Sequence, residues 1–236
     1  MKEEPVSFST AAGNLRGIIH YPATAPLGCI ITCHGLFSSK DSDKFIVLGE
    51  RFVREQFVLL RFDFRGCGES DGEVEDTTIT GRKEDLEAAV AFIKRHIPPA
   101  ARRVGFLGSS LGGFIALLVA PYHASVKAVV TWATPFSFDT LRAAITHSTS
   151  PRLRKEFFTD ARSYRPHLFV PRVKNLLIIH GDGDETVPVN HAHRLYQAAK
   201  EPKELEIVAG ADHVFSDGNH RDRAITASLN WFQHYL

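Results

Sequence analysis

Three residues of types that act together in nucleophilic catalysis occur in the order Ser110, Asp184 and His213. A serine hydroxyl attacks a carbonyl carbon efficiently only when a base removes its proton, and a carboxylate commonly orients that base. Ser110 is the centre of Gly108-Ser109-Ser110-Leu111-Gly112, which follows the apolar run Val104–Leu107 and precedes an apolar helix-like segment. Strand, Gly-x-Ser-x-Gly and helix form the setting of a nucleophile elbow, in which the serine projects from a sharp turn. The pattern therefore predicts that Ser110 is a catalytic nucleophile.

The acidic partner is predicted in the loop after the apolar segment Asn175–His180. This loop carries Asp182 and Asp184 before Val187-Pro188 begins the next helix. Asp184 is favoured because it is placed to turn inward just before that helix. Asp182 is expected to hydrogen-bond the loop's own backbone, as Asp often does in Gly-rich turns. Asp139, which follows the preceding strand, is an alternative acid.

The general base is predicted to be His213, one of 12 histidines in the chain. It lies in a Gly-flanked loop directly after the strand-like segment Leu205–Val208. The chain order serine, acid, histidine is the one expected for a nucleophile elbow of this kind. The histidines on predicted helices or at their starts are expected to be surface residues: His191, His193, His220 and His234.

Two backbone N–H groups are predicted to form an oxyanion hole, the set of donors that holds the negative charge developing on the attacked oxygen. The residue after the nucleophile supplies one donor in such an elbow, so the N–H of Leu111 is expected to be one of them. The loop after the first full strand should supply the other, which places it at Leu36 in His34-Gly35-Leu36. His34 is expected to brace this loop rather than to act as a second base.

The composition is that of an ordinary soluble globular protein. The chain has 236 residues, 44% hydrophobic and 23% charged, with a formal net charge of +1. This balance argues against nucleic acid as the main partner, and no run approaches the roughly 18 apolar residues of a membrane span. The polar start lacks the apolar core of a signal peptide, so we expect a cytoplasmic protein with no membrane partner.

Disulfide, metal and cofactor chemistry are not predicted. Three cysteines do not make a disulfide framework. Cys29 and Cys33 share a predicted strand, about 13 Å apart and too far to bridge, so they are expected to be small core residues. Cys67 is expected to fill space in a Gly-rich turn. No Cys/His cluster has zinc spacing, and the glycines of 66–72 do not match a dinucleotide-binding fingerprint.

Strand-like and helix-like segments alternate along most of the chain. After a predicted hairpin over 6–21, apolar segments predict strands at Gly28–Cys33, Phe57–Asp63, Val104–Leu107, Val126–Ala133, Asn175–His180 and Leu205–Val208. Apolar periodicity predicts helices around 45–53, 81–96, 111–120, 189–199 and 220–234. The alternation predicts one α/β domain over 1–236, with a mostly parallel sheet and helices on both faces. In such sheets the chemistry gathers at the carboxyl ends of the strands.

One long interval interrupts this alternation, between Val126–Ala133 and Asn175–His180. Its short helical patches predict a small cap over the sheet, inserted at about 138–172. The cap carries seven basic residues against three acids. Such charges either attract an acidic substrate or solvate an outer helix face, and we favour solvation. The aromatic residues of the cap either wall an apolar pocket or pack the cap onto the sheet.

Five motifs in this order resemble the α/β-hydrolase superfamily: His34-Gly35 after a strand, Asp63-x-Arg65-Gly66-x-Gly68-x-Ser70, Gly108-x-Ser110-x-Gly112, His180-Gly181-x-x-Asp184-x-x-Val187-Pro188 and Asp212-His213. Within it the chain is similar to compact bacterial esterases of the feruloyl/cinnamoyl esterase and dienelactone-hydrolase-like group. It departs from the dienelactone hydrolases proper, which use cysteine at the position of Ser110.

The resemblance implies an α/β-hydrolase fold with a mostly parallel eight-stranded sheet. It also implies hydrolysis of a small-molecule carboxylic ester through an acyl-enzyme, and no cofactor is implied. The protein is expected to be a monomer or homodimer, which the sequence does not distinguish. Thioesterase, peptidase or acyltransferase chemistry on the same fold is the enzymatic alternative. A catalytically silent ligand-binding protein is the alternative of another class.

Overall fold

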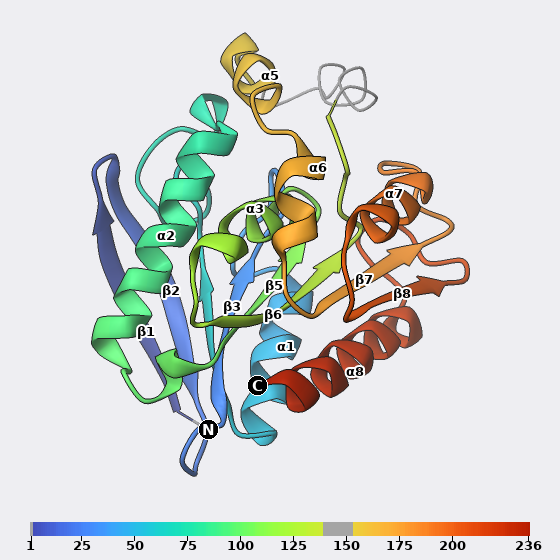
Figure 1. Cartoon of the computed structure of the whole chain (residues 1–236). Coiled ribbons are helices and arrows are strands. Elements are labelled where there is room, and N and C mark those ends of the chain that lie inside the picture. The colour runs from blue at the N-terminus through green and yellow to red at the C-terminus, as the bar shows by residue number, and fades with distance from the viewer. Residues whose placement is uncertain (1, 139–152) are drawn as a thin grey trace.

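The computed structural model describes residues 2–138 and 153–236, which contain an eight-stranded sheet in the order β1-β2-β4-β3-β5-β6-β7-β8 (Figure 1). Strands β1 (Lys2–Thr10) and β2 (Gly13–Tyr21) form an antiparallel hairpin, and β2 pairs antiparallel with β4 (Phe57–Phe62). Every pair from β4 to β8 is parallel. The predicted mostly parallel eight-stranded sheet is therefore confirmed.

The other parallel strands are β3 (Gly28–Cys33), β5 (Val104–Ser109), β6 (Val126–Trp132), β7 (Leu176–Gly181) and β8 (Lys203–Val208). Apolar residues dominate β3, β5, β6 and β7, whereas half of β8 is charged. Every residue of β3, β4, β5 and β7 is buried, as expected for strands covered on both faces. Strand β8 ends the sheet, and only its last residue is fully buried.

Helices cover both faces of the sheet, each over its own hydrophobic core (Figure 1). Helices α1 (Asp43–Arg54) and α8 (Gly218–Tyr235) pack over one core. Helices α2 (Ile79–His96), α3 (Leu111–Val119) and α7 (Asn190–Ala198) pack over the other. Short 3-10 turns lie at η1 (Val74–Asp76), η2 (Ala100–Arg102) and η3 (Ala120–Tyr122).

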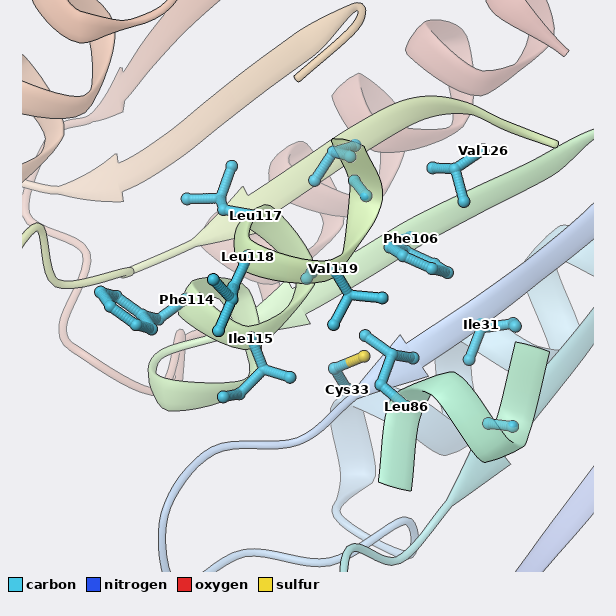
Figure 2. Packing of buried hydrophobic residues seen from close by; sticks show 14 of the residues in the cluster. Ile31, Cys33, Leu86, Phe106, Phe114, Ile115, Leu117, Leu118, Val119 and Val126 are labelled. Carbon is cyan, nitrogen blue, oxygen red and sulfur yellow. The ribbon is translucent and has the colours of Figure 1, made fainter. Parts of the chain in front are cut away.

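Helix α3, which follows the Gly-x-Ser-x-Gly turn, is buried along its whole length. Figure 2 shows its side chains, Ile115 among them, packed with Ile31 and Cys33 of β3, Phe106 of β5 and Leu86 of α2. A helix with no solvated face holds its first residue in a fixed position, because any shift would disrupt close packing.

The described part of the predicted cap contains α5 (Lys155–Ala161), α6 (Pro166–Phe169) and the 3-10 turn η4 (Val170–Arg172). Two oxygens of Asp160 bind the start of α2: Oδ2 accepts from the Thr80 N–H at 2.9 Å, and Oδ1 lies 2.5 Å from Thr80 Oγ1. A carboxylate at a helix N-terminus is favourable because it meets free N–H groups and the positive end of the helix dipole. Asp139, the alternative acid, lies outside the described residues.

Within the described ranges, we find no helix of the length and apolarity that crossing a membrane requires.

Candidate active site

Ser110 occupies the sharp turn between β5 and α3 with φ +55° and ψ −123°. A positive φ is costly for a residue with a side chain and persists only where the surroundings impose it. Ser110 donates its N–H to the Trp132 carbonyl at 2.8 Å, and close backbone contacts enclose the turn. A Cβ added at Gly112 would lie 2.0 Å from the Cys33 carbonyl oxygen, and one at Gly108 would lie 2.5 Å from the Gly112 oxygen. The turn therefore has the geometry of a nucleophile elbow.

His213 lies between the other two predicted residues. Its Nε2 is 3.1 Å from Ser110 Oγ and its Nδ1 is 2.8 Å from Asp184 Oδ2. His213 is 103 residues from Ser110 and 29 residues from Asp184 in the sequence. The three side chains nevertheless meet because they follow β5, β7 and β8 at the same edge of the sheet. The His213 side chain is 19% exposed and that of Asp184 is fully buried. The geometry suits transfer of the serine proton to the ring, whose other nitrogen donates to a carboxylate.

Asp184 is held as a carboxylate by its surroundings. Its Oδ1 accepts from the Thr186 N–H at 2.9 Å and the Val187 N–H at 2.7 Å, and its Oδ2 lies 3.3 Å from His180 Nε2. Burial raises the pKa of Asp184, but hydrogen bonds from His180, His213 and the Val187 N–H together outweigh it and hold the pKa well below its ordinary value. The acid is therefore ionised throughout the neutral range.

Asp182 lies on the same loop but binds a different partner from the one expected. Its Oδ1 accepts from the Gly210 N–H at 2.6 Å, so it binds the loop after β8 rather than its own backbone. That neighbouring loop carries His213. Asp182 thus ties the loop of Asp184 to the loop of His213, and the expectation of a bond within its own loop was wrong.

The loop after β3 lies directly against the nucleophile. A Cβ added at Gly35 would be 3.3 Å from Ser110 Cβ. His34 braces this loop, as predicted: its ring is buried, Nδ1 donates to the Gly35 carbonyl at 2.8 Å, and Nε2 accepts from the Phe64 N–H at 3.0 Å. The residue after Gly35 is Leu36, and Leu111 is the first residue of α3, whose N–H has no acceptor within its own helix.

The Asp63-to-Ser70 motif shapes the loop after β4. Asp63 is buried, and its carboxylate accepts from the Lys40 N–H at 2.7 Å, Lys40 Nζ at 3.0 Å and the Glu69 N–H at 3.1 Å. Arg65 forms an ion pair with the buried Asp85 of α2 at 2.7 Å. These contacts hold the chain in place beside the catalytic edge, so the motif has a structural role.

Sequence reasoning missed Arg82, a fully buried arginine on α2. Its Nη1 donates to the Gly35 carbonyl at 3.2 Å and lies 3.4 Å from that of His34, while Nη2 lies 3.3 Å from Cys67 Sγ. The sequence did indicate its burial, because Arg82 is four residues before Leu86 and therefore lies on the same apolar face of the helix.

His191 was wrongly expected at the surface. It is 1% exposed, and its Nδ1 accepts the Phe136 N–H at 2.9 Å. It lies on the stripe of α7 that also buries Leu195, so periodicity again carried the signal.

Fold and family define the class of this protein, a hydrolase of the α/β-hydrolase superfamily. The model of the prolyl oligopeptidase family, Peptidase S9, matches residues 53–236, and the chain belongs to this family. It is 31% identical over 210 residues to the uncharacterized protein YqkD of Bacillus subtilis, a match that covers 81% of this chain and 67% of YqkD. It is 28% identical over 204 residues to the uncharacterized protein YfhR of Escherichia coli O157:H7, covering 83% of this chain and 67% of YfhR. The chain thus matches about two thirds of the length of these relatives.

Solved structures agree on the fold. The esterase domain of a Rhodothermus marinus protein aligns over 100% of this chain and 99% of its own, with a TM-score of 0.81 and 25% identity. Est1E from Butyrivibrio proteoclasticus, determined with ferulic acid bound, aligns over 98% of both chains with a TM-score of 0.87 and 19% identity. At that identity the second likeness concerns the fold alone.

Proposed function

We propose that this chain is a serine hydrolase that cleaves carboxylic esters through an acyl-enzyme. The observation that carries the proposal is the position of His213, 3.1 Å from Ser110 Oγ on one side and 2.8 Å from Asp184 Oδ2 on the other. The strained elbow conformation of Ser110 supports it independently.

In the first half of the proposed reaction, Ser110 Oγ attacks the acyl carbon while His213 Nε2 takes the hydroxyl proton. Asp184 holds the ring with Nδ1–H toward its carboxylate and stabilises the imidazolium that forms. The N–H groups of Leu36 and Leu111 donate hydrogen bonds to the former carbonyl oxygen and stabilise its negative charge. His213 then returns the proton to the departing alcohol, which leaves an acyl group on Ser110.

In the second half, His213 takes a proton from water and the hydroxide formed attacks the acyl-enzyme. The same two N–H groups stabilise the second tetrahedral intermediate. Its collapse frees the carboxylic acid and returns the proton to Ser110. None of these steps requires a metal or an organic cofactor.

Ester cleavage is favoured by the Rhodothermus marinus structure, which is described as an esterase domain. The name of the prolyl oligopeptidase family favours a peptidase as the second candidate. Both reactions use the same triad, so they differ in the leaving group that His213 must protonate. Thioester cleavage and acyl transfer to an acceptor other than water use the same first half-reaction.

The test is hydrolysis of p-nitrophenyl esters from acetate to octanoate by the wild type, Ser110→Ala and Ser109→Ala. Ser109 is the matched control because it is the adjacent serine and accepts a hydrogen bond from Lys44 Nζ at 2.8 Å. Ser110→Ala should lower kcat/KM by about three orders of magnitude or more, and Ser109→Ala should retain turnover. Activity that survives Ser110→Ala would refute the mechanism.

A matched ester, thioester and anilide with one acyl group then distinguish the reaction types. Faster cleavage of the anilide would favour the peptidase. Ligand binding without turnover of any of the three would favour a silent binding protein.

A further inference from the structure

A cavity of about 450 Å³ lies between the described part of the cap and the elbow helix α3. Its wall combines aromatic rings with cationic side chains: Phe114, Phe136, Ser137, Phe138, Phe158, Ala161, Arg162, Tyr164, Arg165, Pro166, His167 and Arg194. This volume is of the size that accommodates a small organic ligand.

Several residues that line the cavity lie a few positions beyond the catalytic edge of the sheet, although Ser110, Asp184 and His213 do not line it. Phe114 stands four residues beyond Ser110 on α3, which corresponds to about 6 Å along the helix axis. Phe136 follows β6, the neighbour of the strand that carries the elbow, and donates its N–H to His191 on α7. Helix α6 contacts both α3 and α7, and these two helices follow β5 and β7 at the catalytic edge.

The charged side chains that line the cavity within residues 2–138 and 153–236 are all cationic. They are Arg162, Arg165 and Arg194, and no aspartate or glutamate of these described ranges lines it. Across residues 2–138 and 153–236, none of these three guanidinium groups forms an ion pair with a carboxylate, whereas Arg154, just before α5, pairs with Asp76 at 2.8 Å. Unpaired guanidinium groups beside a cavity favour an anionic ligand, because their planar donors match a carboxylate.

Apolar walls restrict which anion fits. Arg194 stacks over the Phe136 ring at 4.2 Å, an arrangement that leaves the edge of the guanidinium plane free to donate. Phe114 and Phe138 pack edge to face at 4.9 Å on the inner side. A small hydrated anion would leave these rings in contact with water, so the walls favour an anion attached to an aryl or alkyl group.

We propose that this cavity is a subsite for a carboxylate on an aryl or alkyl group of the substrate. The reading of the cavity as part of a substrate site rests on the proposed function, whereas binding of the carboxylate can be tested without turnover. The substrates would then be esters whose acyl or alcohol part ends in a second, free carboxylate.

The binding test uses calorimetry on Ser110→Ala with 4-phenylbutyrate and 4-phenylbutyramide, which differ mainly in charge. The carboxylate should bind at least tenfold more tightly than the amide. That preference should vanish when Arg162→Gln, Arg165→Gln and Arg194→Gln are combined. It should persist in Arg172→Gln, a matched control whose guanidinium stacks on Tyr122 at 4.8 Å, away from the cavity.

A preference that the triple variant retains would overturn the proposal, because the carboxylate would then be held at the catalytic centre instead. Equal binding of the acid and the amide would overturn it as well. The three arginines are exposed, so their replacement should leave folding intact, which circular dichroism checks.

The kinetic test compares the p-nitrophenyl monoester of adipic acid with p-nitrophenyl hexanoate. The ratio of kcat/KM, acidic to neutral ester, should fall at least tenfold in the triple variant. If the arginines strengthen binding but neither ester is turned over, the proposed subsite is supported and the proposed esterase function is contradicted. If both esters are turned over and the ratio of kcat/KM is the same in the wild type and the triple variant, the esterase function is supported and the subsite is contradicted.

Discussion

The guanidinium group of Arg82 donates to the carbonyl oxygen of Gly35 at 3.2 Å, across 47 positions of sequence. The same oxygen accepts from His34 Nδ1 at 2.8 Å. A peptide unit is planar and trans, so the Gly35 carbonyl and the Leu36 N–H point in opposite directions. By holding the carbonyl on the buried side, Arg82 and His34 direct the Leu36 N–H away from it. A buried cation thus sets the orientation of a main-chain donor that we propose for the oxyanion hole.

Replacing Arg82 with methionine tests this arrangement. The variant keeps a side chain of similar volume but loses both hydrogen bonds to the loop. Because removing one oxyanion donor typically costs 10²–10³ in kcat, misdirecting one should lower kcat by about 10–100-fold with little change in KM. The free energy of unfolding should fall by about 1–3 kcal/mol, because the buried carbonyl oxygens of His34 and Gly35 lose a donor.

Kinetics of short p-nitrophenyl esters, together with thermal unfolding, measure both effects. Arg82→Lys is the control, since it keeps a charge without the planar fork and should recover only part of the rate. A wild-type kcat in Arg82→Met would contradict the positioning role.

Asp184→Asn and Asp182→Asn form a matched pair on one loop. Asp184 accepts from His213, so its amide variant should lower kcat by about 10⁴, because the ring loses its favoured tautomer. Asp182 accepts from the Gly210 N–H, which the oxygen of an amide can also bind, so its variant should lose less than about tenfold. Ester hydrolysis at neutral pH measures both. Equal losses in the two variants would reassign the catalytic acid.

The stability of the fold should fall with acid through His34. Burial lowers the pKa of His34 well below its ordinary value of 6.5, and the Arg82 charge acts in the same direction. The unfolded chain therefore binds a proton below pH 6.5 that the folded chain does not, so this contribution to stability is full above pH 6.5 and is lost as the pH falls. The free energy of unfolding should therefore fall between pH 7 and pH 5.

Urea unfolding of the wild type and His34→Gln at both pH values measures this difference. Glutamine does not titrate, so the free energy of unfolding of the variant should fall less than that of the wild type over that interval. Parallel losses in the two proteins would show that His34 is protonated in the folded state or that other groups dominate.

Leu117 and Leu168 test which helices support the core. Leu117 of α3 is 0% exposed, and Leu168 of α6 is 63% exposed. Leu117→Ala should lower the free energy of unfolding by about 2–5 kcal/mol through lost burial and a residual cavity. Leu168→Ala should change it by less than about 0.5 kcal/mol. Urea denaturation measures both changes. Similar losses would show that α6 unfolds together with the core and contributes to global stability.

Strands with continuous apolar runs could be predicted closely from the sequence. The predicted segment Gly28–Cys33 is the whole of β3, because a strand buried on both faces has no polar alternation to obscure its limits. Helix α2 begins at Ile79 rather than at Gly81. Its start is set by Thr78, whose Oγ1 accepts from the Gly81 N–H at 3.0 Å, a capping bond that places the helix boundary before the first periodic residue.

The proposed triad could be predicted from the order of its residues along the chain. The contacts between loops that support it could not. Ser110, Asp184 and His213 follow three strands of one parallel sheet, so the topology alone brings them to one edge. Arg82 and Asp182 act on loops from other parts of the chain. Local pattern does not encode which carbonyl a buried arginine reaches, or which of two neighbouring loops an aspartate binds.

Strand β8 pairs with β7 and is the last strand of the sheet, with no neighbour on its other side among residues 2–138 and 153–236. The residue proposed as the base follows this peripheral strand, while the proposed nucleophile follows a central one. Peripheral parts of a fold open locally at lower free energy than its core strands. We therefore expect heating to abolish activity at a temperature where the central strands are still folded.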